Sequence, residues 1–189
     1  MHDHSAPTSK ALHQRGFSLT EILLVTAILG TIALVAIPQS STSDVQILDL
    51  ATQQVVDAIR FTHAESIRRE ETLGVYINAS DQQLKLYTWD SASNPANAIY
   101  NINHPVEKRS YALDFNDHSM IKRVSIDIVN FQFSGGDFSS SNLLFAASSG
   151  VPRFQSQTRL LSLGQIILSV GGHNRTINIE PVTGRVTVL

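Results

Sequence analysis

Glu21 is a carboxylate inside an otherwise apolar stretch of the chain. It stands near the start of the run from Phe17 to Ile37, which holds no other charged residue. A charge deep in a membrane costs about 2.5 to 3.5 kcal/mol on insertion scales unless it is paired or close to the interface. Glu21 therefore needs either a cationic partner or a place near a helix N-terminus, where the helix dipole stabilises a carboxylate by about 0.3 to 1 kcal/mol.

Histidines and serines are the other residues that could do chemistry. Four histidines stand alone in the sequence, and we expect them at the surface: His63, His104, His118 and His173. None of them has the HxxH or HExxH spacing of a metal site, and no serine lies in a GxSxG motif. The chain has no cysteine, which excludes disulfides, thiolate zinc sites and cysteine nucleophiles. The sequence therefore predicts no catalytic residue, no metal and no cofactor.

The run 17–37 is long enough to place Glu21 in a membrane-spanning helix. At about 1.5 Å per residue, such a helix would be roughly 31 Å long. Lys10 and Arg15 precede the run and no basic residue follows it directly, so the positive-inside rule leaves the N-terminus in the cytoplasm and exports the remainder. A cleaved secretory signal peptide is the competing interpretation, which the length of the run and its carboxylate disfavour.

A second helix is expected after Pro38, which lacks a backbone donor and should kink or break the first helix. Residues 38–72 return to helical periodicity. The apolar residues near one stripe are Leu48, Ala51, Val55, Ile59 and Ala64. We therefore expect an amphipathic helix that packs on a sheet.

After Gly74 the apolar residues alternate with polar ones, which is typical of strands. The alternating sets are Val75 and Ile77, Leu84 and Leu86, Val124, Ile126 and Ile128, Ile166 and Leu168, and Ile177 and Ile179. Turn-rich segments separate them: SASNPAN, NINHPVEK, SSGVPR and SGGDFSSSN, the last expected to be a flexible loop. Residues 171–174 predict a hairpin, 181–184 a turn and 185–189 a closing strand. The sequence therefore predicts an α+β fold with a long N-terminal helix on a mainly antiparallel β-sheet domain.

The segment RGFSLTE, from Arg15 to Glu21, resembles the signal of type IV prepilins. In that family a membrane-embedded prepilin peptidase cuts after the glycine and methylates the new N-terminal residue. The resemblance implies cleavage between Gly16 and Phe17 and N-methylation of Phe17. A glycine before the cut has no Cβ, so its backbone can enter a narrow protease cleft in an extended form. The departures from the pattern are Thr20, where an aliphatic residue is more usual, and a long leader.

The same resemblance implies roles in assembly. Glu21 would pair with the Phe17 amino group that cleavage creates, its own or that of the neighbouring subunit, and loss of one partner of a buried pair costs about 3 to 5 kcal/mol. Gly30 and Pro38 stand where pilin helices carry a helix-loosening glycine and proline. The chain would divide into a leader (1–16), a transmembrane and filament-core helix (17–37), its amphipathic continuation (38–72) and an exported β-rich domain (73–189).

Two further segments resemble one family of pilin-like proteins. FTHAESIRREETLGVYI, residues 61–77, and RTINIEPVTGRVTVL, residues 175–189, resemble the GspH/FimT family of minor pseudopilins. The resemblance implies a minor pseudopilin of a type II secretion system, anchored by one span in the bacterial inner membrane, with its N-terminus cytoplasmic and its C-terminal domain periplasmic. It would join the periplasmic pseudopilus at or near the tip. Its expected partners are prepilin peptidase, the major pseudopilin, other minor pseudopilins and secreted substrate.

A FimT-like minor pilin of a type IV pilus, acting in pilus assembly or DNA uptake, is the alternative function. Arg175 and Arg185 are its candidate DNA contacts, although no second arginine stands beside Arg185 in the segment GRVT. The formal net charge of -2 and the scattered basic residues give no footprint for broad nucleic-acid binding. An anchored exported enzyme is a third interpretation, for which the sequence offers no catalytic constellation.

Overall fold

The structure is a computed structural model that describes residues 18–35, 40–93, 97–135, 138–155 and 158–189. Its chain forms two compact units, Met1–Gln39 and Ser40–Leu189, which are described separately below. Within the described residues, no helix combines the length and the apolar character needed to cross a membrane. Both ends of the predicted span 17–37 lie outside those residues, so that span stays a prediction.

The described part of the first unit is the helix α1, Leu19–Val35. Ser18 begins it, because the Ser18 carbonyl oxygen accepts hydrogen bonds from the backbone N–H groups of Glu21 (3.0 Å) and Ile22 (3.2 Å). The Thr26 hydroxyl donates to the Ile22 carbonyl oxygen within the helix, 3.0 Å away. Gly30 lies inside α1, whose backbone is helical on both sides of it. A glycine there costs about 0.8 to 1 kcal/mol of helix propensity relative to alanine.

The second unit begins with the helix α2, Ser40–Arg69. As predicted, Leu48, Ala51, Val55 and Ile59 are buried on one face. The fifth residue of the predicted stripe, Ala64, is exposed. At 100° per residue, a position five beyond Ile59 turns away from the stripe.

Two polar residues continue the buried face of α2 instead of Ala64. Thr62 and Ser66 are fully buried. The Thr62 hydroxyl donates to the Ala58 carbonyl oxygen (2.8 Å), and the Ser66 hydroxyl donates to the His63 carbonyl oxygen (2.8 Å). Hydroxyl groups that are hydrogen-bonded within their own helix can be buried without an unsatisfied donor.

Two antiparallel sheets follow α2. The first has the order β3-β2-β1-β7-β8, with β4 paired to the same edge of β2 as β3. Its strands are β1 (Leu73–Asn78), β2 (Gln83–Asp90), β3 (Asn97–Ile99), β4 (Ala112–Asp114), β7 (Asn142–Phe145) and β8 (Pro152–Arg153). The second has the order β11-β10-β9-β5-β6. Its strands are β5 (Ser125–Phe133), β6 (Phe138–Ser140), β9 (Leu161–Val170), β10 (His173–Ile179) and β11 (Val186–Val188).

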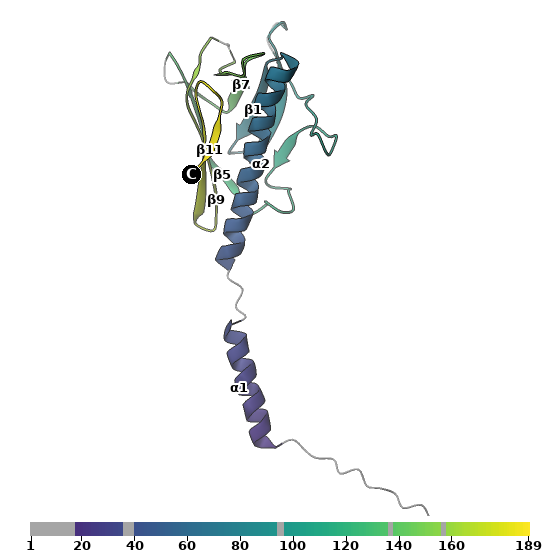
Figure 1. Ribbon diagram of the computed structural model, residues 1–189, viewed down its shortest axis with the longest axis vertical. Coiled ribbons are helices and arrows are strands. Elements are labelled where there is room, and N and C mark those ends of the chain that lie inside the picture. Colours follow the sequence, from purple (N-terminus) through teal and green to yellow (C-terminus); the bar gives the residue numbers. More distant parts are fainter. Residues whose placement is uncertain (1–17, 36–39, 94–96, 136–137, 156–157) are drawn as a thin grey trace, which may run out of the picture. The chain divides into compact units, whose positions relative to one another are not determined.

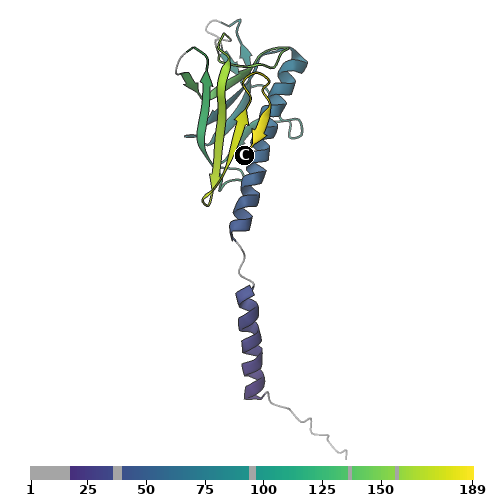
Figure 2. The same ribbon diagram turned by 60° about the vertical axis from the view of Figure 1, so that its left-hand side comes forward.

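The core of the second unit lies where α2 meets both sheets. α2 packs on β1 and β2 of the first sheet and on β9, β10 and β11 of the second, as Figures 1 and 2 show. The largest fully buried side chains are Tyr87, Phe115, Phe131, Phe133 and Phe145. Because each such side chain contributes about 1.5 to 3 kcal/mol by leaving water, this shared core holds the three layers together. The predicted α+β class, with a helix packed on antiparallel sheets, is confirmed.

The predicted hairpin after β9 is also confirmed. Val170 pairs with His173, so Gly171 and Gly172 alone connect β9 to β10. Both glycines have positive φ, +56° and +84°. Two-residue hairpins of this kind use type I′ turns, which need positive φ at both central positions and therefore favour glycine.

The alternation predicted for Val124, Ile126 and Ile128 is wrong at its last member. Ile126 is buried, but Ile128 exposes 46% of its surface. The register of β5 against β9 shifts between these two residues, where Asp127 is an extra residue in β5. A bulge adds one residue, so the side chains after it change faces. Phe131 and Phe133 then form the buried set of the strand.

Three segments that were predicted as turns contain short strands. The expected flexible loop SGGDFSSSN includes β6, which pairs with β5 from Phe133↔Phe138 to Phe131↔Ser140. SSGVPR contains β8, and SASNPAN ends with the first residue of β3. These strands have two or three residues. A partner strand supplies their hydrogen bonds, and no alternation of their own is long enough to reveal them.

Candidate functional site

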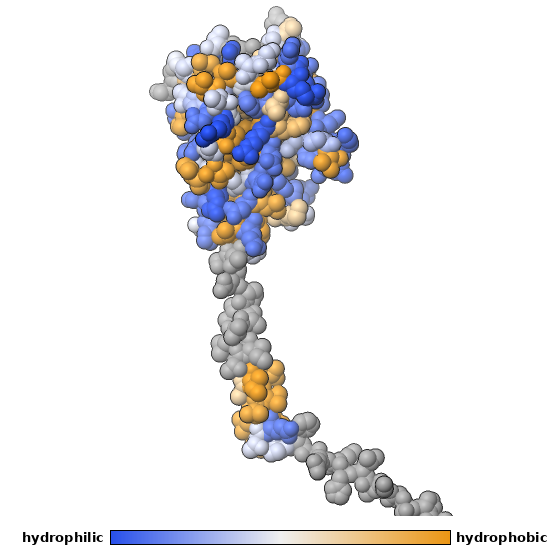
Figure 3. Space-filling model, viewed as in Figure 1, coloured by the Kyte–Doolittle hydropathy of each residue, from blue (hydrophilic) through white to orange (hydrophobic). Residues whose placement is uncertain are grey.

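Glu21 lies in the first turn of α1 and is exposed to solvent. Its neighbours Ile22, Leu23, Leu24 and Val25 are exposed as well, by 47% to 63% of their surface. Four successive helix residues point in directions 100° apart, so these side chains cover the whole circumference. Figure 3 shows apolar residues over most of the described part of this helix. A helix with apolar side chains around its whole circumference requires an apolar environment.

The predicted processing site lies outside the described residues, because they do not include Gly16, Phe17 or Pro38. Cleavage, methylation and the pair between Glu21 and the Phe17 amine therefore stay predictions. Within the part of the chain that the structure describes, no cation forms an ion pair with the Glu21 carboxylate. The loosening roles of Gly30 and Pro38 stay predictions too.

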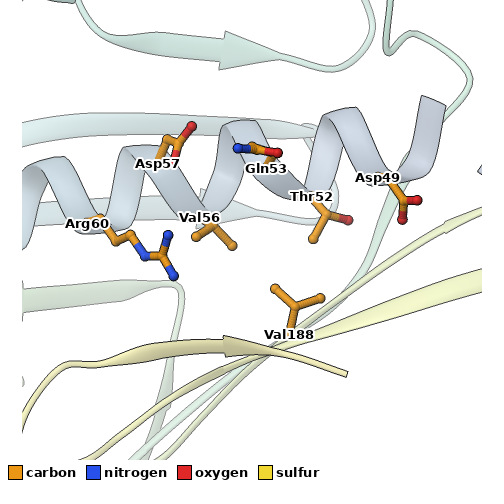
Figure 4. Close-up of a pocket in the computed structure, with 7 residues that line it drawn as sticks. All are labelled: Asp49, Thr52, Gln53, Val56, Asp57, Arg60 and Val188. Carbon is orange, nitrogen blue, oxygen red and sulfur yellow. The ribbon is translucent and has the colours of Figure 1, made fainter. Parts of the chain in front are cut away.

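A groove of about 290 Å³ runs between α2 and the end of β11. Figure 4 shows Thr52, Val56 and Arg60 extending from α2 toward Val188 on β11. The Arg60 guanidinium donates to the Val186 carbonyl oxygen at 3.4 Å, which ties the strand to the helix. The groove is open and combines one arginine, two aspartates and apolar surface.

The two candidate DNA contacts, Arg175 and Arg185, lie far apart. Arg175 is on β10, and its Nε donates to the Asp49 carboxylate on α2 at 2.9 Å. Arg185 is exposed and follows the turn between β10 and β11, where its carbonyl oxygen accepts from the Glu180 N–H. At about 3.4 Å per residue, the five steps of strand from Arg175 to Glu180 separate the two arginines by roughly 17 Å. The structure therefore does not bring them into one basic patch.

Replacing Arg175 with glutamine should affect stability slightly and DNA binding not at all. The ion pair with Asp49 is partly exposed, with 32% and 54% of the two side chains accessible. Such pairs contribute about 0.2 to 1 kcal/mol. A double-mutant cycle with Asp49→Asn in urea measures this coupling. Gel-shift titration of Arg175→Gln and Arg185→Gln at several salt concentrations tests the DNA alternative, which lower affinity and a weaker salt dependence in either variant would support.

The four histidines predicted at the surface are all half-buried. His63 packs on the ring of Phe145, with ring centres 5.3 Å apart, and burial lowers the pKa of its imidazole. His173 begins β10. His104 and His118 line one hollow, although the sequence separates them. The prediction of surface positions is therefore only partly right, because neighbouring residues cover part of each histidine.

A second hollow, which we call the Tyr111 cavity, lies between α2 and the chain around β4. It has a volume of about 310 Å³, and its polar lining includes Gln54, Asp57, His104, Glu107, Tyr111 and His118. Sequence reasoning missed it because no two of its polar residues form a recognised motif. In the part of the chain that the structure describes, no group of three or more histidine, aspartate or glutamate residues is placed to hold a metal ion.

Comparison with known proteins shows a likeness to a solved structure. Neither a protein-family model nor a curated protein matches the chain. Among solved structures, the chain is similar to the minor pseudopilin EpsH from the type 2 secretion system of Vibrio cholerae. The likeness has 13% sequence identity and a TM-score of 0.48, and it covers 75% of this chain and 95% of that chain. Membership of the GspH/FimT family stays a prediction from the sequence motifs.

Proposed function

We propose that the chain is a minor pseudopilin of a type II secretion system, processed by prepilin peptidase and added at or near the tip of the pseudopilus. The observation that carries the proposal is α1, a helix with apolar side chains on every side and one charged residue, Glu21, in its first turn. Gly16 and Phe17 stand directly before this helix and supply the processing junction that the sequence predicts.

The apolar surface of α1 supports a role in a filament core. A large aliphatic side chain gains about 1.5 to 3 kcal/mol when it moves from water into an apolar surrounding. Lipid would cover α1 before assembly, and the α1 helices of neighbouring subunits would cover it afterwards. Between helices that leave lipid, van der Waals packing rather than transfer from water drives association. The proposed filament core is therefore a bundle of α1 helices.

The second unit would work in the periplasm, because the basic residues before α1 keep the N-terminus in the cytoplasm. Its α2 is attached to both sheets by a continuous core, so the unit forms one firm body for contacts with other subunits. The groove beside Val188 offers both charge signs and apolar surface to such a partner. The proposed partners are the major pseudopilin and other minor pseudopilins.

Mass spectrometry of the membrane-bound protein tests the processing step. We expect the mature chain to begin at Phe17 with an N-methyl group, because Gly16 presents an unobstructed backbone to the peptidase. Gly16→Val is the matched variant and should leave the leader in place, since its branched Cβ disfavours entry into the narrow cleft. A mature chain that begins at any other residue, or an unprocessed wild-type chain in cells with active prepilin peptidase, would contradict the proposal.

A further inference from the structure

The Tyr111 cavity is built from three separate parts of the second unit. α2 contributes Gln54 and Asp57, and the chain between β3 and β4 contributes His104, Glu107 and Tyr111. The third part, β4 and the residues after it, contributes Leu113 and His118. Two backbone hydrogen bonds hold this second part in a narrow hairpin, from the Tyr111 N–H to the Ile102 carbonyl oxygen (2.7 Å) and from the His104 N–H to the Arg109 carbonyl oxygen (2.7 Å). The cavity therefore has firm walls.

The cavity carries negative charge without a described counter-charge. Asp57 and Glu107 both line it, and no described lysine or arginine does. Neither carboxylate takes part in the ion pairs of the described residues. Asp57 also lines the groove beside β11, where the Arg60 guanidinium donates to the Val186 carbonyl oxygen. Both carboxylates are free to accept hydrogen bonds from a ligand.

Gln54 and Tyr111 are polar residues that line the cavity, and Gln54 Oε1 is buried without a hydrogen-bond partner in the described part of the chain. Only 6% of the Tyr111 surface is exposed. Its ring lies between those of His104, with centres 4.6 Å apart, and Phe61, with centres 5.5 Å apart. Burial raises the pKa of Tyr111, and the nearby charges of Asp57 and Glu107 raise it further. An aromatic wall and two carboxylates therefore line the same cavity.

The two histidines have ring nitrogens that accept backbone hydrogen bonds. His104 Nδ1 accepts from the backbone N–H groups of Val106 (3.3 Å) and Glu107 (3.2 Å). His118 Nδ1 accepts from the Met120 N–H at 3.4 Å. The Nδ1 atom of each ring is therefore already occupied by backbone N–H groups. The carboxylates of Asp57 and Glu107 remain as charged acceptors for a ligand.

We propose that the Tyr111 cavity binds the guanidinium or alkylammonium group of an organic cation. Two carboxylates accept charge-assisted hydrogen bonds, which are roughly twice as strong as neutral ones, and an aromatic face attracts a cation. The volume lies at the low end for ligand pockets, so it suits a small amine or one basic side chain. No residue of α1 takes part, so the inference does not depend on the proposed filament role.

Titration of the full-length chain in detergent with arginine amide tests the inference, with citrulline amide as the matched ligand. Citrulline has nearly the same shape as arginine, but its ureido group is uncharged. We expect arginine amide to bind at millimolar concentration, as measured by calorimetry, and citrulline amide to bind at least tenfold more weakly. Equal affinity for the two ligands, or no binding of arginine amide, would overturn the inference.

Two substitutions test whether arginine amide binds in the Tyr111 cavity. Asp57→Asn and Glu107→Gln should each raise the dissociation constant of arginine amide at least tenfold, because each removes one charged acceptor. Both residues are exposed, as is Asp127 on β5, so Asp127→Asn is the control and should change nothing. Unchanged affinity in both cavity variants would place the binding elsewhere and refute the assignment.

Titration with the peptide Gly-Arg-Gly distinguishes two sources of the cation, which are a basic side chain of a protein and a free small molecule. If the peptide binds like arginine amide, the cavity accepts a basic side chain of a protein. If only the free amide binds, the ligand is a small molecule. Both results retain the assigned chemistry, and failure of both ligands to bind excludes it.

Discussion

Replacing Glu21 with glutamine should leave cleavage of the precursor intact and abolish recovery of the chain in assembled filaments. In the proposed filament core, the Glu21 carboxylate pairs with the Phe17 amine, and removal of one partner leaves a buried charge that costs about 3 to 5 kcal/mol. A loss of that size lowers an association constant by more than a hundredfold. N-terminal sequencing measures cleavage, and quantitative blotting of the purified filament fraction measures incorporation.

Thr26→Val is the matched control for this experiment. It also removes a polar group from α1, but the Thr26 hydroxyl is bound to backbone carbonyl oxygens of its own helix. Incorporation should therefore stay at the wild-type level. The lesser role for Glu21, stabilisation of the helix dipole, predicts a change of only about 0.3 to 1 kcal/mol and near-normal incorporation of Glu21→Gln. Normal recovery of that variant would refute the pairing role.

Much of the fold could be predicted because long elements repeat their pattern. The stripe of α2 and the alternation in β9 and β10 persist long enough for their period to be unambiguous. Gly171 and Gly172 indicate their turn because few other residues adopt positive φ twice in succession. Residues close together in the sequence determine these features, so a single sequence is enough to predict them.

The features that could not be predicted depend on residues distant in sequence. The bulge at Asp127 exists because β5 must match β9, and the sequence of β5 alone gives no sign of it. The short strand β6 is defined by its pairing with β5. His104 and His118 meet on the Tyr111 cavity only after the chain around β4 folds against α2. Candidate binding residues of this kind become visible only in three dimensions.

The structural role of Gly74 could not be predicted from the sequence either. Gly74 stands just before the alternating residues, so the sequence predicts that a strand begins after it and not that it lies inside one. It lies within β1, between Tyr87 on β2 and Leu144 on β7. The hydrogen bond from the Tyr87 hydroxyl to Asn142 Oδ1 on β7, at 3.1 Å, crosses β1. A Cβ on Gly74 would lie 2.6 Å from the Tyr87 hydroxyl oxygen. The glycine thus makes room for a fully buried ring.

Gly74→Ala should therefore destabilise the chain by about 2 to 4 kcal/mol. Displacement of a buried ring costs about 1 to 3 kcal/mol, and the lost hydrogen bond costs about 0.5 to 1.5 kcal/mol. Thermal unfolding followed by circular dichroism should show a midpoint lower by about 4 to 16 °C, given about 2 to 4 °C per kcal/mol for a unit of this size.

The sign of the stability change caused by Gly74→Ala shows whether a neighbour obstructs the new methyl group. Where no neighbour obstructs the new methyl group, Gly→Ala stabilises a chain by about 0.4 to 1 kcal/mol through the unfolded state. Tyr87→Phe removes only the hydroxyl and should cost about 0.5 to 1.5 kcal/mol. In a Tyr87→Leu background the ring is gone, so Gly74→Ala should lose most of its effect. An equal cost of Gly74→Ala with and without the ring would show that the strand itself, and not Tyr87, requires glycine at this position.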